Sequence, residues 1–180
     1  MTDNQEKAII SEVLSGEHEQ YRFLVERYHK GLILHLYNLI HNEQTAKDVA
    51  QEAFIRAYDK LSQYNDAYAF STWLYKIADN IAIRHMQQAK VTQDISEIEE
   101  TLPEDKPSMA EMADRAFTHK IVRNAVDTLP AGYRQVIALY YWDNFSYEEI
   151  AEIINRPIGT VRTWLFRAKE ELRKELYGQV

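Results

Sequence analysis

Apolar residues recur at helical spacing along most of this chain, and this pattern constrains the fold more than any other feature. No stretch shows the sustained apolar and polar alternation of a β-strand, and only 5 Gly and 4 Pro interrupt the 180 residues. The clearest apolar stripes consist of Val49, Ala50, Ala53, Phe54, Ala57, Tyr58 and Leu61, and of Phe70, Trp73, Leu74, Ile77, Ala78 and Ile81. The chain is therefore predicted to be all-α.

The pattern divides the chain into two helical domains, residues 1–90 and 119–180, joined by a linker at 91–118. The linker carries 8 acidic and 2 basic residues, which indicates a solvated, flexible segment. It is either a plain spacer or a linker with a function of its own, and charge alone does not separate the two. In the first domain, helices are predicted before Gly16 and at about 21–40, 49–61 and 70–81, the last of which would be capped by Ser71 or Asn65. In the linker, a helix is predicted to begin near Met109. In the second domain, helices are predicted at about 119–129, 133–142, 147–154 and 158–176.

The composition excludes several classes of protein. There are no cysteines, so disulfides and thiolate metal sites are excluded. The N-terminal residues are acidic and polar, unlike a signal peptide, and no apolar run approaches the roughly 20 residues that cross a bilayer. We therefore expect a cytoplasmic protein without direct membrane insertion.

The distribution of charge matters more than its sum. The net charge of −7 by itself argues against binding nucleic acid. The acidic excess lies in residues 1–17 and 91–118, however, and the two remaining segments are balanced. A balanced segment can still present a basic face to phosphates, so nucleic-acid binding stays open.

The strongest local signal lies between residues 146 and 174. Ser146 and Glu149 have the spacing of a capping box, Asn155 tolerates the left-handed conformation of a tight turn, and Pro157 suits the start of the next helix. Two helices joined by so short a turn predict a helix-turn-helix, which lays its second helix in the major groove. The competing interpretation is a plain helical hairpin whose charges only solvate it. Base edges and phosphates would be contacted by Arg162 and Thr163, and by Arg156, Arg167 and Lys169.

Together with the first half of the chain, these residues resemble the extracytoplasmic-function sigma factors of the bacterial sigma-70 family. Four segments resemble the fourth conserved region of that family: LPAGYR (129–134), SYEEIA (146–151), GTVR (159–162) and FRA (166–168). DVAQEAFIRA (48–57) resembles the polymerase-binding helix of the second region, and FSTWLYKIADN (70–80) resembles its promoter-melting helix. The sequence departs from the family at Tyr58, Asn155 and Trp164; Trp164 either alters promoter preference or simply packs.

The resemblance implies a transcription initiation factor that binds core RNA polymerase, reads the −35 promoter element as duplex and melts the −10 element. The −35 contacts would come from Arg156, Thr160, Arg162, Thr163, Phe166, Arg167 and Lys169. The −10 contacts would come from Tyr64, Asp66, Tyr68, Phe70, Lys76, Asn80 and Arg84, with Trp73 more often core than contact. Polymerase would dock on Asp48, Gln51, Glu52, Ile55 and Arg56.

The resemblance also implies that the chain is not an enzyme, has no cofactor, and is commonly restrained by an anti-sigma factor. One alternative is a conventional helix-turn-helix regulator that acts without polymerase, against which the docking and melting motifs speak. The other is a metalloenzyme. His18, His29, His35 and His41 lack the spacing that places three ligands on one face, and no HExxH motif or Gly-rich phosphate loop occurs.

Overall fold

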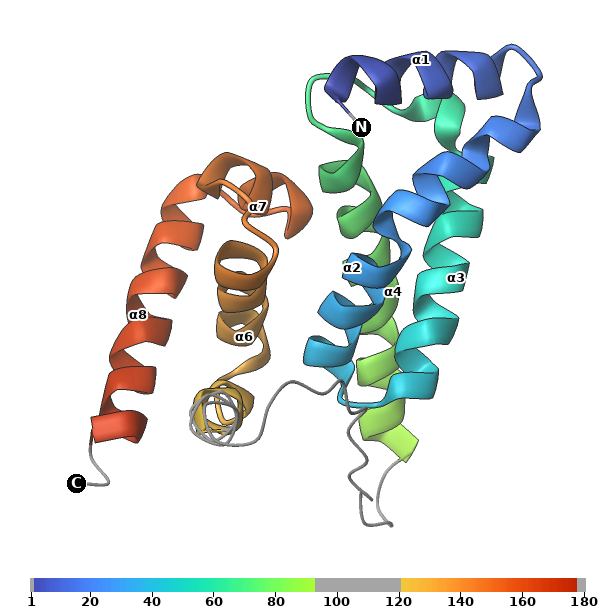
Figure 1. The fold of residues 1–180 in the computed structure, drawn as a ribbon. Helices are drawn as coiled ribbons and strands as arrows, with labels where there is room; N and C mark the ends of the chain where they lie inside the picture. The colour runs from blue at the N-terminus through green and yellow to red at the C-terminus, as the bar shows by residue number, and fades with distance from the viewer. Residues whose placement is uncertain (1, 93–120, 178–180) are drawn as a thin grey trace, which may run out of the picture.

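The structure is a computed structural model that describes residues 2–92 and 121–177, and both ranges are helical without a strand (Figure 1). The prediction of an all-α fold is confirmed. The predicted linker and the helix expected near Met109 lie outside the described residues, except that 91 and 92 still belong to the last helix of the first range. No helix within these two ranges is long and apolar enough to cross a membrane.

The first range forms an N-terminal bundle in which α2, α3 and α4 lie side by side and α1 crosses one end of them (Figure 1). Its core contains the predicted apolar stripes, since Val49, Ala53 and Leu74 have no exposed surface. Its elements are α1 (Asp3–Leu14), η1 (His18–Gln20), α2 (Tyr21–Ile40), α3 (Glu43–Asp59), η2 (Leu61–Gln63) and α4 (Phe70–Thr92).

A short polar side chain marks the start of α3. Asn42 caps α3, because its side-chain oxygen accepts a hydrogen bond from the Thr45 backbone N–H at 2.8 Å. The predicted caps of the helix at 70–81 are wrong, since α4 begins at Phe70 and Ser71 lies inside it. Asn65 instead accepts from the Ala67 N–H at 3.0 Å, which stabilises a turn in the preceding loop.

The second range forms a C-terminal bundle. Its elements are a helical segment at 121–127, α6 (Ala131–Ile137), η3 (Ala138–Trp142), α7 (Tyr147–Ile153) and α8 (Ile158–Tyr177). The turn η3 is a π-helical continuation of α6, in which the Asp143 N–H donates to the carbonyl of Ala138 at 3.1 Å. This wide turn ends with Asp143 directed at the N-terminal bundle.

The two bundles share one continuous apolar cluster, and a buried polar network joins them across it. His35, on α2, has no exposed side-chain surface, and its ring lies between two carboxylates. Its Nε2 is 2.7 Å from Asp79 Oδ1 on α4, and its Nδ1 is 2.7 Å from Asp143 Oδ2 in the C-terminal bundle. Gln135, on α6, donates to the second oxygen of Asp79. The helices of the two bundles therefore meet in a defined register.

The carboxylates set the charge of this histidine. Burial by itself would lower the pKa of His35, but the charges and hydrogen bonds of Asp79 and Asp143 raise it to about 10. Burial, with the same two carboxylates, raises the pKa of Tyr75, whose ring centroid lies 4.9 Å from that of His35. His35 is therefore a buried imidazolium at neutral pH, and both ring N–H groups donate.

Replacing His35 with Gln should change how stability depends on pH. A pKa raised from 6.5 to about 10 adds stability that is complete below pH 6.5 and is lost as pH rises through 10. The lost ion pairs should cost His35→Gln about 3–5 kcal/mol near pH 6, and the gap to the wild type should narrow by up to about 1.4 kcal/mol per pH unit above that. Urea denaturation across this range measures the gap, and a gap that stays constant would contradict the assignment.

Candidate nucleic-acid and polymerase interfaces

The helix-turn-helix forms as the sequence predicts. The Ser146 hydroxyl accepts from the Glu149 N–H at 3.3 Å, and the Glu149 carboxylate accepts from the Ser146 N–H at 2.9 Å, which completes a capping box on α7. Asn155 has a positive φ of 51°, so it turns the chain between α7 and α8. The backbone N–H of Thr160 then donates to the Pro157 carbonyl at 2.8 Å in the first turn of α8.

The outer face of α8 carries the candidate −35 residues. Arg156, Arg162 and Arg167 are exposed, and Phe166 keeps 67% of its surface exposed, the largest fraction of any exposed large apolar residue in the described ranges. An apolar ring so exposed is available for contact with a partner. Two candidates are less available, since Thr160 is half-buried and the Thr163 hydroxyl donates to the Gly159 carbonyl at 2.9 Å.

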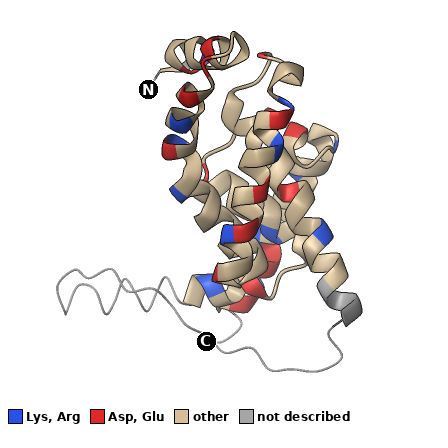
Figure 2. Ribbon diagram, turned by 90° about the vertical axis from the view of Figure 1, so that its right-hand side faces the viewer, with Lys and Arg blue, Asp and Glu red and all other residues tan. Residues whose placement is uncertain are grey.

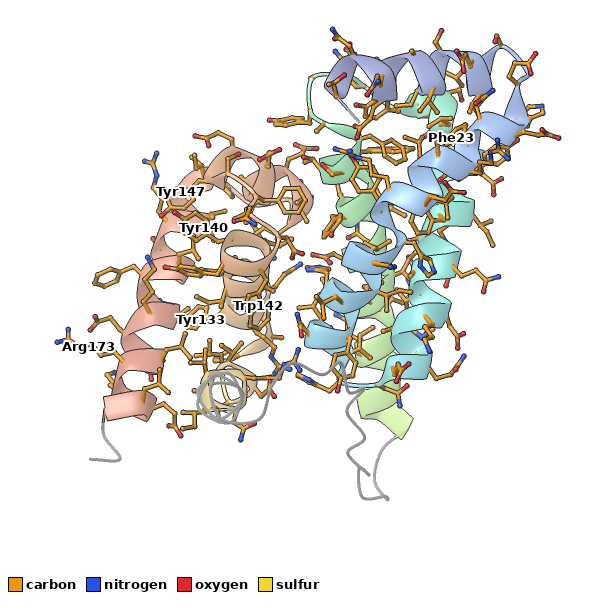
Figure 3. The ribbon with its side chains drawn as sticks, in the orientation of Figure 1. Phe23, Tyr133, Tyr140, Trp142, Tyr147 and Arg173 are labelled. Carbon is orange, nitrogen blue, oxygen red and sulfur yellow. The ribbon has the colours of Figure 1, made fainter. Side chains whose placement is uncertain are left out.

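Lys169, although exposed, and Trp164, which is half-buried, contact residues of the neighbouring helices. The Lys169 ammonium lies 5.4 Å from the ring centroid of Tyr141 and 5.9 Å from that of Tyr140, and its hydrogen bond to Tyr141 raises the pKa of this lysine. Figure 3 shows Tyr140 between α6 and α8, with Arg173 pointing away from the bundle. The Trp164 ring packs across Gly132, so packing explains this departure from the family pattern.

An aromatic cluster supports the candidate −10 loop. The ring centroids of Tyr64 and Trp73 are 5.4 Å apart, each lies 5.8 Å from that of Phe70, and the Tyr64 hydroxyl donates to the Tyr68 carbonyl at 2.7 Å. Phe70 is only 1% exposed, so it offers no face to a base. Phe70 therefore lies beneath the loop, whereas Tyr68 is an exposed ring of the loop itself.

Ionic contacts engage other −10 candidates. Lys7, on α1, binds Asp66 at 2.9 Å, and this hydrogen bond lowers the pKa of Asp66. The Lys76 ammonium lies 2.6 Å from the Glu152 carboxylate on α7. Asn80 is exposed but donates to the Lys76 carbonyl at 2.8 Å, and Arg84 is exposed. On the face drawn in Figure 2 basic and acidic residues are interspersed along the helices.

The candidate polymerase residues share one face of α3. Asp48, Gln51 and Ile55 are exposed, and Ile55 keeps 54% of its surface. Glu52 and Arg56 are half-buried and pair with each other one turn apart at 2.5 Å. On this face the apolar side chain of Ile55 is therefore flanked by charged side chains. Such a surface is suited to binding a protein.

Comparison with known proteins identifies the chain. The family "Sigma-70 region 2" matches residues 24–92, and "Sigma-70, region 4" matches residues 119–172. The "ECF RNA polymerase sigma factor SigW" of Bacillus subtilis is 35% identical, over 94% of this chain and 96% of its own length. The chain belongs to the sigma-70 family. It is a sigma factor of the extracytoplasmic-function type and acts in transcription initiation.

Other relatives agree with this assignment. The "RNA polymerase sigma-H factor" of Pseudomonas aeruginosa is 33% identical to this sigma factor, over 98% of the chain and 96% of the relative. Among solved structures, CnrH in complex with the cytosolic domain of CnrY has a TM-score of 0.71 at 21% identity, covering 96% of this chain and 97% of that chain. The sigma factor RpoE, in complex with the anti-sigma factor NepR from Bartonella quintana, has the same TM-score at 21% identity, covering 88% and 97%. The latter two similarities show the fold.

Sequence reasoning missed the residues that connect the two halves of this sigma factor. Glu152 is bonded to Lys76, and the Glu149 carboxylate accepts from the Thr72 hydroxyl at 3.2 Å. Histidine spacing excludes a metal site but does not predict the role of His35, although its place among apolar neighbours of α2 is a signal that it is buried. Nothing local in the sequence points from these residues to their distant partners.

Gly132→Ala should disturb the seating of α8. A Cβ built at Gly132 lies 2.7 Å from a Trp164 ring carbon, so the ring must move, at an overpacking cost of about 1–3 kcal/mol. In a Trp164→Ala background the same change should stabilise the protein, because Ala exceeds Gly in helix propensity by about 1 kcal/mol. Urea denaturation of the four proteins measures this reversal of sign; an equal effect in both backgrounds would show that the ring does not constrain Gly132.

Proposed function

We propose that the exposed side of α8 reads the −35 element in the major groove, with Arg162, Thr163 and Phe166 toward the bases. Arg156 and Arg167, together with Thr160 and Lys169, would contact or position the sugar-phosphate backbone. The observation that carries this assignment is the capped helix-turn-helix, whose second helix leaves Arg162 and Phe166 exposed near its start. Lys169 would have to leave its tyrosine partners to reach a phosphate.

The same proposal assigns the −10 element to the loop 64–69 and to α4. Melted bases need a replacement for stacking, which Tyr64 and Tyr68 would provide above the buried Phe70. Asp66 and Asn80 would contact base edges, and Lys76 and Arg84 the backbone. The aromatic cluster beneath the loop supports this assignment because its rings pack under the loop and the Tyr64 hydroxyl donates to the Tyr68 carbonyl.

We propose that core polymerase binds the face of α3 that carries Asp48, Gln51, Glu52, Ile55 and Arg56. With it we assign residues 1–90 and 119–180 to the two promoter-reading domains and 91–118 to the linker between them. The sigma factor would work in the cytoplasm and carry out no bond chemistry of its own. We also propose restraint by an anti-sigma factor, supported by the similar RpoE structure, which was solved with the anti-sigma factor NepR.

Reversing two charges on α3 should abolish binding to core polymerase. The double variant Asp48→Lys with Glu52→Lys should repel a polymerase surface that is complementary to the native acidic residues. The fold should stay intact, because the lost Glu52–Arg56 pair is half-exposed and such pairs contribute about 0–1 kcal/mol to stability. Pull-down with core polymerase, followed by run-off transcription, measures the loss. Glu19→Lys with Glu26→Lys, two exposed sites in the same bundle, is the matched control. Wild-type association by the α3 variant would exclude this face.

Arg162→Ala should relax −35 specificity. A bidentate contact between arginine and a base contributes about 1–3 kcal/mol of discrimination, so the preference of the holoenzyme for its −35 sequence over single-base variants should fall by about tenfold. Lys174→Ala, which removes an exposed cation from the far end of the same helix, should leave that preference unchanged. Equal preference in wild type and Arg162→Ala would assign base reading to other residues.

A further inference from the structure

Helix α1 lies outside the family match, which begins at residue 24, yet it contacts the loop that the proposed function gives to the −10 element. The Lys7 ammonium of α1 lies 2.9 Å from Oδ2 of Asp66 in that loop. Lys7 is the only basic residue of α1, so no other side chain of this helix could pair with that carboxylate. In Figure 1 the start of α1 and the loop before α4 lie at the same end of the N-terminal bundle. The N-terminal helix therefore reaches one of the side chains that would read a base.

The packing of α1 determines where Lys7 lies. Ile10 is buried in the core, and Glu6 keeps only 4% of its surface exposed. The Glu6 carboxylate pairs with Arg27 Nε at 2.7 Å and accepts from the Tyr28 hydroxyl at 2.5 Å. A buried carboxylate with two such partners is costly to move, because the ion would lose both of them. Since Glu6 directly precedes Lys7, the anchored helix places Lys7 at a defined position beside the loop.

The same buried carboxylate connects α1 with the rings beneath the loop. The Tyr28 ring centroid lies 5.8 Å from that of Phe70, and the Phe70 ring packs against Tyr64 at the start of the loop. The loop is thus supported from beneath by aromatic rings and contacted directly by Lys7. Both contacts lead back to two consecutive residues of α1, Glu6 and Lys7.

The ion pair restrains Asp66 without occupying all of its acceptor sites. An ionised carboxylate only accepts hydrogen bonds and has about four acceptor sites, so one ammonium leaves Asp66 able to accept from the donor groups of a base. The Lys7 ammonium donates to one oxygen, Oδ2, which restrains the direction of the other. The two side chains keep 51% and 66% of their surface exposed, so the pair adds little to the stability of the fold. Its effect is therefore on orientation.

From these observations we propose that Lys7 is a positioning residue for the −10 element. It holds the Asp66 carboxylate in the orientation in which this group accepts a hydrogen bond from a base of the melted strand, and α1 thereby contributes to selectivity without touching DNA. This inference rests on the proposed −10 role of Asp66. Direct binding of a phosphate by Lys7 is a different role, because it would strengthen binding to every sequence alike.

Holoenzymes reconstituted with Lys7→Ala, with Asp66→Ala and with both changes test this role. Each transcribes a set of templates, made from a promoter that the wild-type holoenzyme uses, in which every −10 base in turn is replaced by the other three. Run-off product relative to the native template gives the selectivity at each position. Lys7→Arg keeps the cation and should retain wild-type selectivity. Lys30→Ala, which removes an exposed lysine of α2, is the matched control.

We expect Asp66→Ala to lower selectivity about tenfold at one −10 position, and Lys7→Ala to lower it about threefold at the same position. The double variant should lose no more than Asp66→Ala alone, because Lys7 acts only through Asp66. Wild-type selectivity in Lys7→Ala, or an equal loss of transcript from every template, would overturn the positioning role.

The Asp66→Ala holoenzyme distinguishes this failure from a failure of the proposed function. If Asp66→Ala leaves selectivity unchanged at every position, the proposed −10 role of Asp66 is wrong and the inference falls with it. If Asp66→Ala loses selectivity and Lys7→Ala does not, only the positioning role is wrong. Pull-down with core polymerase, measured in parallel, checks that each variant enters the holoenzyme.

Discussion

A buried positive charge that needs two carboxylates governs how the halves of this sigma factor meet. The imidazolium of His35 is enclosed by α2, α4 and the end of η3, where an unpaired ion would be costly. Asp79 comes from its own bundle, but Asp143 comes from the other. When the two bundles separate, His35 therefore loses one of its two carboxylate partners, and Asp143 loses the imidazolium. This dependence fixes which face of the C-terminal bundle meets α2 and α4.

The helix-turn-helix is coupled to that interface through one side chain. Glu149 closes the capping box that starts α7 and also accepts from Thr72 of the N-terminal bundle. The local device that defines the DNA-binding motif is thus also part of the contact between bundles. Gly132 and Trp164 couple α6 to α8 in a comparable way, because the close approach of the helices depends on a missing Cβ. Packing and recognition consequently share residues in the C-terminal bundle.

Local sequence patterns predicted the helices and the turn, whereas contacts between distant residues could not be predicted. Apolar periodicity identified the core of α3 and α4, and Asn155 adopts the left-handed conformation expected of the turn. The candidate −10 site was less predictable, since the burial of Phe70 depends on rings packed around it from other elements. The partners of His35 and Lys76 lie up to 108 residues away, and periodicity carries no information on such pairs.

The π-helical turn η3 has a consequence for how tolerant this fold is to changes in chain length. In an α-helix each residue advances the side-chain direction by about 100°. The wider turn at Ala138–Trp142 therefore sets the rotational phase with which Asp143 leaves α6. An insertion of one residue there would rotate this carboxylate off the imidazole without removing any hydrophobic residue. Homologues with one residue more at this point would therefore dock their two halves in another orientation, even with the same apolar residues in the core.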